Sequence, residues 1–308
     1  MFPLIPHAIF AAFGSSSMTM SAMASSSSIR LALTSSSMKW AVGGWSFFIA
    51  ENCILSENRS YLISQLGDDG YHAAYGTLST AAMGSAFYGY FRHVRNAAPL
   101  LWTGSVAPLS SKLFGFVFLS VGLGMASQIP PKVQIPVHYA GGDDAPPLHS
   151  STVPVANGSG EGGAGWKVRC PFDFTDKKNT GDGHIVHGLE RITRHPGLWS
   201  LGFMGLGSAC LVPSLPQKAW LAMPMLVALI GGEHTDSRYR RGMGGLLTDE
   251  YDRATSNIPF LALLSGTQGN VGAVLHEFVR EVKPLNAAIA VGLSGLWVLT
   301  KGRGVKIR

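Results

Sequence analysis

The stretch LFGFVFLSVGLGMASQI, from Leu113 to Ile129, contains no charged residue. A helix needs about 20 mostly apolar residues to cross the hydrocarbon layer of a membrane, with about 17 as the lower end. This stretch meets that length, and five others come close to it. We therefore predict an all-α fold, a polytopic transmembrane helical bundle of about six spans, at Trp40–Leu55, Tyr71–Phe91, Leu113–Ile129, Gly197–Val212, Ala219–Gly231 and Pro284–Thr300.

The composition supports an integral membrane protein. Hydrophobic residues make up 46% of the 308 residues and charged residues only 14%, against about 25% charged in an ordinary soluble domain. This balance excludes a disordered chain and argues against a soluble enzyme. The 24 Lys and Arg residues are spread in short groups and form no basic stripe of the kind that binds nucleic acid. Three scattered cysteines exclude a disulfide framework.

Two segments differ from the predicted spans. Residues 1–37 are rich in serine, and the first 50 residues contain no Asp or Glu, which is the composition of an organellar targeting segment. Residues 130–183 are rich in proline and glycine and carry charges of both signs, which predicts a solvated, disordered loop. This loop separates a front half of three spans, residues 38–129, from a back half of three spans, residues 184–308.

Small residues recur along the predicted spans, and they allow helices to approach closely within a membrane. In the second span, Gly76, Ser79, Met83 and Ala86 follow spacings of three and four, which places them on one helical face. Gly84 lies beside them. We predict that this face packs against other helices of the bundle.

The densest polar cluster is GLERITRHP, from Gly188 to Pro196, directly before the fourth predicted span. Pro196 suits the first turn of a helix, so Arg191, Arg194 and His195 are predicted at the membrane boundary, beside the positive end of a helix dipole. There they could hold an anionic group, and His195 could bind a metal or carry a proton. An interfacial basic anchor with a partly solvated histidine is equally consistent with the pattern.

Other polar residues lie at the ends of predicted spans. His93 follows the second span and could be an interfacial histidine or an axial haem ligand, which requires an imidazole nitrogen aimed into the bundle. Glu51 and Asn52 lie within the last part of the first span, and ionisable residues inside a span usually face the bundle. If that helix ends at residue 50, both are merely interfacial. The mixed charges of residues 233–241 and 250–253 favour a solvated loop with local ion pairs.

Several motifs occur in one order along the chain. GDDGYHAAYGTLSTAAMG begins at Gly67, YFRH at Tyr90, ERITRHPGLWSLG at Glu190, EYDRATSNIPFLALLSG at Glu250 and HEFVR at His276. With these motifs the sequence resembles the NnrU family of membrane proteins, over about residues 38–300. Within that family it is most similar to the plastid zeta-carotene isomerases.

This resemblance implies a cofactor, a substrate class and a location. It implies haem b held by histidines, here His195 and His93, and a cis-to-trans isomerisation of a hydrophobic polyene. Arg191 and Arg194 would pair with haem propionates or lipid phosphates, since guanidinium suits both. The partners would be membrane lipid and the polyene, with no nucleic acid. The location would be an organellar membrane, with the plastid favoured over the mitochondrion.

The chain departs from the family pattern at two positions. Asn52 and Ser208 stand where the family has histidines, and Asn is not a normal haem ligand. Two other functions therefore stay open. A membrane methyltransferase that uses S-adenosylmethionine has a similar RHP motif, followed by residues that Glu233, Tyr251 and Pro259 loosely match. A non-catalytic subunit could dock on a larger membrane complex through small-residue helices.

Overall fold

The computed structural model describes residues 33–98, 100–101, 107–129, 137–140, 165–168, 185–243 and 245–301. Within these ranges the fold is helical, apart from two short strands. The elements are α2 (Ser36–Glu57), α3 (Arg59–Gly89), the π-helix η1 (Tyr90–Val94), α4 (Leu109–Gln128), β1 (Val137–Ala140), β2 (Gly165–Val168), the 3-10 helix η2 (Gly188–Arg191), α5 (Pro196–Leu211), α6 (Leu215–Arg240), α7 (Asp249–Ala254), α8 (Leu261–Leu264), α9 (Val271–Glu281) and α10 (Pro284–Lys301).

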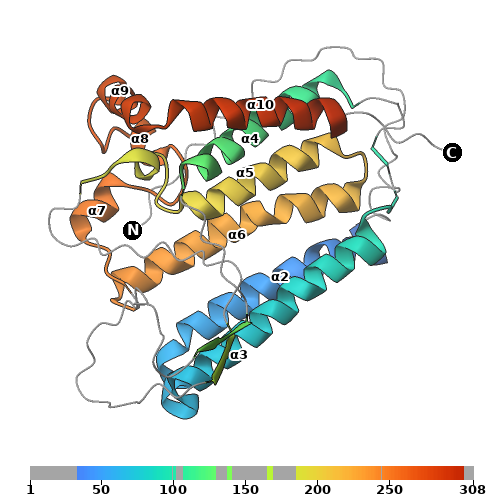
Figure 1. The fold of residues 1–308 in the computed structure, drawn as a ribbon, viewed down its shortest axis with the longest axis vertical. Coiled ribbons are helices and arrows are strands. Elements are labelled where there is room, and N and C mark those ends of the chain that lie inside the picture. The colour runs from blue at the N-terminus through green and yellow to red at the C-terminus, as the bar shows by residue number, and fades with distance from the viewer. Residues whose placement is uncertain are drawn as a thin grey trace.

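The long helices lie side by side in the order α10, α4, α5, α6, α2, α3 (Figure 1). Each of the six predicted spans falls on one of them, so the prediction of an all-α bundle is confirmed at the level of its helices. Helix α2 begins at Ser36, where the hydroxyl of Ser35 accepts a hydrogen bond from the Met38 amide at 3.2 Å. The predicted targeting segment otherwise lies outside the described residues.

The number of spans is not confirmed. Within the described residues, α4 is the helix that is long and apolar enough to cross a membrane by itself, and α9 with α10 forms a second such stretch that bends by 89°. Three of the other helices show why they do not meet this requirement of length and apolar character. Helix α5 has only 16 residues, about 24 Å of helix, while α3 begins with charged residues and α6 ends with them.

Close helix packing depends on residues without large side chains, as predicted. A Cβ atom on Gly122 of α4 would lie 2.6 Å from the Met204 amide nitrogen, and one on Gly207 of α5 would lie 2.7 Å from that of Leu119. On α3, Gly76, Ser79 and Ala86 are buried, whereas a Cβ on Gly84 would meet nothing within 4 Å. Glycine at these crossings therefore lets neighbouring backbones touch.

Of the predicted loop at residues 130–183, the structure describes only β1 and β2. They pair antiparallel, with Val137 opposite Val168 and Ala140 opposite Gly165, and β2 lies against α3. At these two places the prediction of a disordered loop is wrong, because the backbones pair. The rest of that loop lies outside the described residues.

Candidate functional site

The RITRHP segment lies between η2 and α5, at the end of the bundle where α6 also ends. Thr193 is fully buried, and Arg194 and His195 are each 4% exposed. Pro196 begins α5, as its missing amide proton predicts. The alternative of a partly solvated interfacial histidine is therefore wrong, because the segment is packed inside the fold.

One buried carboxylate contacts both motif residues. Asp236 of α6 is 1% exposed, and its Oδ1 lies 2.7 Å from His195 Nε2. Its Oδ2 lies 3.0 Å from the NH1 atom of Arg194. A buried charge is costly unless it is paired and hydrogen-bonded, so these contacts stabilise the carboxylate and the guanidinium together.

The guanidinium of Arg194 also ties the motif to α7. Its Nε donates to Thr255 Oγ1 at 3.0 Å, and its NH2 lies 2.7 Å from Asp252 Oδ1. Arg240 pairs with the same carboxylate, Nε to Oδ2 at 2.7 Å. Burial alone would raise the pKa of Asp252, but the hydrogen bond from Arg240 and the charges of both arginines lower it overall. The aspartate is therefore held as an anion.

Thr193 and Asn257 complete the arrangement. Thr193 Oγ1 donates to the Asn257 carbonyl at 2.6 Å, and Asn257 Oδ1 accepts from Trp199 Nε1 at 3.0 Å. Its Nδ2 donates to the Leu229 carbonyl at 3.1 Å. We call these interconnected side chains the polar clamp: Thr193, Arg194, His195, Asp236, Asp252, Thr255 and Asn257.

Arg191 faces a different partner, helix α9. Its Nε and NH2 donate to the two carboxylate oxygens of Glu281, at 3.0 and 2.8 Å, and NH2 lies 2.9 Å from Glu277. The bond from Arg191 and a further one from the Gly188 amide lower the pKa of Glu281 to about 2. The predicted anion-binding role of Arg191 is thus taken by acids of the chain itself.

His93 lies at the other end of the bundle. Its ring stacks on Trp40, with centroids 4.9 Å apart and 5° between the planes. Neighbouring Tyr90 accepts a hydrogen bond from Gln217, near the start of α6, at 3.0 Å, whereas His195 contacts Asp236 near its end. The 19 residues between these two positions of α6 correspond to about 28 Å. The structure therefore does not bring His93 and His195 together.

Asn52 takes part in a separate polar cluster between α2 and α3. Its Nδ2 donates to the Phe48 carbonyl at 2.9 Å and to Glu51, and its Oδ1 accepts from the Tyr75 hydroxyl. One turn further along α2, Ser56 lies 2.7 Å from His234 Nε2 of α6. Ser208, the other position at which the resemblance implies a histidine, lies on α5. Asn52 is thus held by hydrogen bonds at a position where the resemblance implies a histidine.

Sequence reasoning missed Asp236 and His234, because residues 233–241 were predicted as a solvated loop. That prediction is wrong, since α6 continues to Arg240 and buries Asp236. The absence of a strong helix stop between the Gly231–Gly232 pair and Gly242 was the available signal. A Cβ on Gly232 would collide with Asn257, so that glycine serves packing and does not end the helix.

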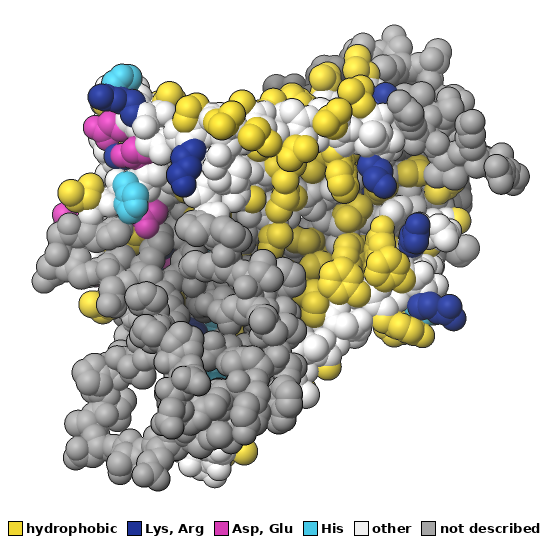
Figure 2. Space-filling view, viewed as in Figure 1, with side chains coloured by type: hydrophobic (Ala, Val, Ile, Leu, Met, Phe, Trp, Pro, Cys, Tyr) yellow, Lys and Arg dark blue, Asp and Glu magenta, His cyan; other side chains and the backbone are white. Residues whose placement is uncertain are grey.

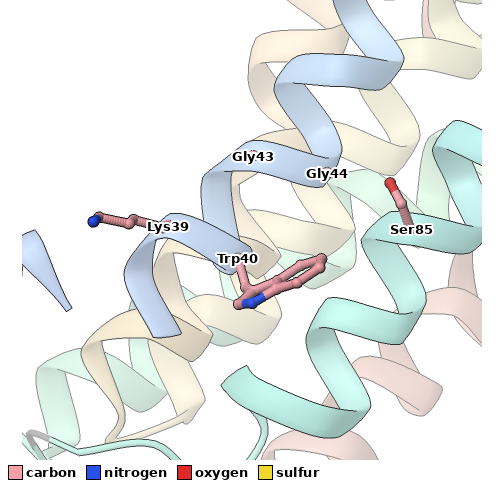
Figure 3. A pocket seen from close by; sticks show the side chains of 5 residues that line it. All are labelled: Lys39, Trp40, Gly43, Gly44 and Ser85. Carbon is pink, nitrogen blue, oxygen red and sulfur yellow. The ribbon is translucent and has the colours of Figure 1, made fainter. Parts of the chain in front are cut away.

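A groove of about 320 Å³ lies between α2 and α3, lined by Lys39, Trp40, Gly43, Gly44 and Ser85. Figure 3 shows the Trp40 ring extending from α2 toward α3, with Ser85 on α3 and Lys39 pointing away. A Cβ on Gly43 would meet nothing within 4 Å. None of the clamp residues lines this groove.

A protein-family model described as NnrU protein matches residues 41–206. The chain belongs to the NnrU family. The match covers α2 to most of α5, including His93, Arg194 and His195, whereas Asp236 and Asp252 lie beyond it. No curated protein and no solved structure matches the chain. The resemblance of this NnrU-family chain to the carotenoid isomerases therefore stays a prediction.

The implied haem b can be compared with these side chains. An open slot for a porphyrin is much larger than a water molecule, so a histidine that borders one would be accessible to water. His195 is 4% exposed and its Nε2 is engaged by Asp236, so no open slot borders it. The residues present do not fit a haem held jointly by His195 and His93.

Proposed function

We propose that this NnrU-family chain is an integral membrane protein of an organelle, with the plastid favoured, and that it binds a hydrophobic polyene of the carotenoid type. The membrane location is supported by where apolar and charged side chains lie: apolar ones on the surface and charged ones in the interior. Apolar side chains on α4 and α10 point outward, including Leu113 at 57% and Leu296 at 60% exposure, while Arg194 and Asp236 are buried. Such a surface is costly in water and is expected where lipid is the solvent.

The surface in Figure 2 agrees with this proposal. Apolar side chains cover much of the face formed by α10, α4 and α5, and acidic side chains and histidines gather at the end where α9 lies. An apolar band next to a charged end is the pattern expected of a protein that reaches from the hydrocarbon layer into the head groups.

The polyene substrate class is proposed from the resemblance to carotenoid isomerases. We propose the groove at Trp40 as its binding site. Trp40 lines the groove with an aromatic side chain, and Gly43, where a Cβ would meet nothing within 4 Å, leaves it open along α2, whereas Gly44 packs against Ala86 of α3. A long conjugated hydrocarbon could enter it from the lipid. Haem b binding stays a prediction of the resemblance alone. Because His195 and His93 do not fit it together, no catalytic step is assigned to it.

The test uses detergent-purified full-length protein and an acyclic cis-carotenoid. Binding is measured by quenching of tryptophan fluorescence, isomer composition by chromatography, and haem by absorption spectra of the oxidised and dithionite-reduced protein. Gly43→Leu should weaken binding roughly tenfold, a loss of about 1.4 kcal/mol, by filling the groove. Gly292→Leu, on the exposed face of α10 where a Cβ meets nothing within 4 Å, should leave it unchanged. Equal binding by both variants would overturn the groove assignment.

A docking subunit is the second candidate function, because the outward apolar side chains also fit contacts with other membrane proteins. It predicts that the chain co-purifies with partner subunits in mild detergent and binds no polyene. The methyltransferase alternative is not favoured. Arg194 is held by Asp236 and Asp252, and Glu233 pairs with Arg240 at 3.3 Å, so neither is placed to hold S-adenosylmethionine.

A further inference from the structure

Helix α9 carries a row of apolar side chains that the described structure leaves exposed to different degrees. Val271, Leu275 and Val279 are 37%, 42% and 70% exposed. At about 100° per residue, they span about 80° of the helix circumference. A row of this kind on an 11-residue surface helix requires a nonaqueous neighbour or another protein.

The opposite side of α9 shows how the helix is fixed. Glu277 and Glu281 each lie about 160° around the helix from Val279, and both contact Arg191. Val274 is buried. The acidic side therefore faces the η2 segment, and the exposed apolar row points away from it.

The direction of α9 relative to α10 indicates what covers the row. The chain turns by 89° between the two helices, and α9 lies across the end of α10 (Figure 1). Helix α10 has 18 residues, about 27 Å of helix, close to the thickness of a hydrocarbon layer of about 30 Å. If α10 crosses that layer, α9 lies parallel to the membrane plane at its surface.

The charges along α9 indicate the kind of surface. The two glutamates are paired with Arg191, while His276, Arg280 and Lys283 are exposed. A helix with an exposed apolar row on one side, and with exposed positive side chains on another side and just past its end, matches a layer of anionic head groups over hydrocarbon. If this side of α9 faced water, exposing the three apolar side chains would be unfavourable.

We propose that α9 is an interfacial helix that lies flat in a membrane surface, with Val271, Leu275 and Val279 among the upper acyl chains and Arg280 and Lys283 at anionic phospholipid head groups. This inference rests on the proposed membrane location of α10. It adds to that location a specific lipid-contact surface at the end of the bundle that carries the polar clamp.

The test is site-directed spin labelling of the full-length protein. In a background with serine at the native cysteines, single nitroxides replace Leu275, Val279, His276, Arg280 and, on α10, Leu293. The labelled proteins are reconstituted in vesicles of phosphatidylcholine and phosphatidylglycerol. Collision rates are measured with oxygen, which enters lipid, and with a water-soluble nickel complex. We expect oxygen to exceed nickel several-fold at 275 and 279, and the reverse at 276 and 280.

The label at Leu293 separates this inference from the one on which it rests. If 293 is accessible to oxygen while 275 and 279 are as accessible to nickel as 280, the membrane location stands and the interfacial helix is overturned. Shielding of 275 and 279 from both reagents would also overturn it, since protein would then cover the row. Nickel access at 293 would overturn the membrane location itself. In vesicles of phosphatidylcholine alone, the oxygen-to-nickel ratio at 279 should fall; an unchanged ratio would overturn the anionic head-group contact.

Discussion

The two ends of α6 are held in different ways. At its start, Trp220 packs among Trp45, Phe87 and Tyr90, and the indole Nε1 donates to the Ala86 carbonyl at 3.0 Å. At its end, Asp236 joins the polar clamp through His195 and Arg194. One end is thus fixed by aromatic packing and the other by buried charge.

The chain connectivity gives a physical reason for the difference. At the start of α6 a three-residue turn, residues 212–214, links it covalently to α5, and the Ser214 hydroxyl donates to the Ala97 carbonyl at 2.7 Å. At the other end no such link joins the two helices. There the side chains of His195 and Arg194 at the start of α5 bind Asp236 near the end of α6, so directional contacts replace a connecting segment.

The largest expected effect is the loss of the clamp carboxylate. Asp236→Ala leaves the Arg194 guanidinium and His195 buried without the carboxylate that contacts both, and removing one partner of a buried ion pair costs about 3–5 kcal/mol. We expect the free energy of unfolding in detergent to fall by this amount, measured by denaturant unfolding. Glu250→Ala, an exposed acid of neighbouring α7, is the control and should change it by less than about 1 kcal/mol. Similar losses in the two variants would show that the clamp does not hold this end.

The aromatic end should respond less to one conservative change. Trp220→Phe keeps a ring but removes the indole hydrogen bond and leaves a small void, for a combined loss of about 2 kcal/mol. The same unfolding experiment measures it. Trp297→Phe, at a position 46% exposed on α10, provides the matched control. A loss at Trp220 larger than that at Asp236 would reverse the ranking of the two ends.

The contact between Arg191 and α9 should make stability depend on acid. Because the fold lowers the pKa of Glu281 to about 2, its contribution is complete above about pH 4.5 and is lost as the pH falls toward 2. Since the pair is accessible to solvent, we expect a loss of under about 1 kcal/mol. Unfolding measured from about pH 6 down to about pH 2 should show this loss, and Glu281→Gln should remove that part of the pH dependence. An equally steep acid profile in the variant would assign the dependence to other carboxylates.

The smallest effect is expected at an exposed ion pair beside the clamp. Arg241 NH2 lies 2.9 Å from Glu57, and the hydrogen bond from Arg241 lowers the pKa of that carboxyl. Exposed pairs contribute little because water and salt screen them. Glu57→Gln should therefore leave the melting temperature unchanged within experimental error. A clear drop would show that the Arg241–Glu57 pair stabilises this end of the bundle together with the polar clamp.

Much of the fold could be predicted from the sequence. Apolar stretches such as Leu113–Ile129 indicated helices, and each of the six became one. Small residues indicated close packing, and Gly122 and Gly207 provide it. The number of membrane spans could not be predicted in the same way, since apolar content identifies a helix without fixing how much of it lies in lipid.

The site could be predicted only in part. The cluster around His195 was found, because Arg, His and Pro together stand out before an apolar stretch. Its partner was not, since Asp236 lies 41 residues further on in a segment whose mixed charges are typical of a loop. Asp236 is buried because residues distant in sequence pair with it in the fold. The composition of its own segment contains no information about those partners. The separation of His93 from His195 depended on the same missing information, the antiparallel course of α5 and α6.

Helices α5 and α6 are held together at both ends, by the polar clamp at one end and by the turn at residues 212–214 at the other. The covalent link in that turn is therefore not the only contact that holds the pair. Because the clamp at one end and the packed turn at the other each hold the two helices, a protease cut within residues 212–214 should yield two fragments that stay associated in detergent. By the same logic the chain could be supplied as two separately expressed pieces divided at that turn. A bundle of this kind is expected to tolerate new chain ends at that turn, so the gene could be divided there.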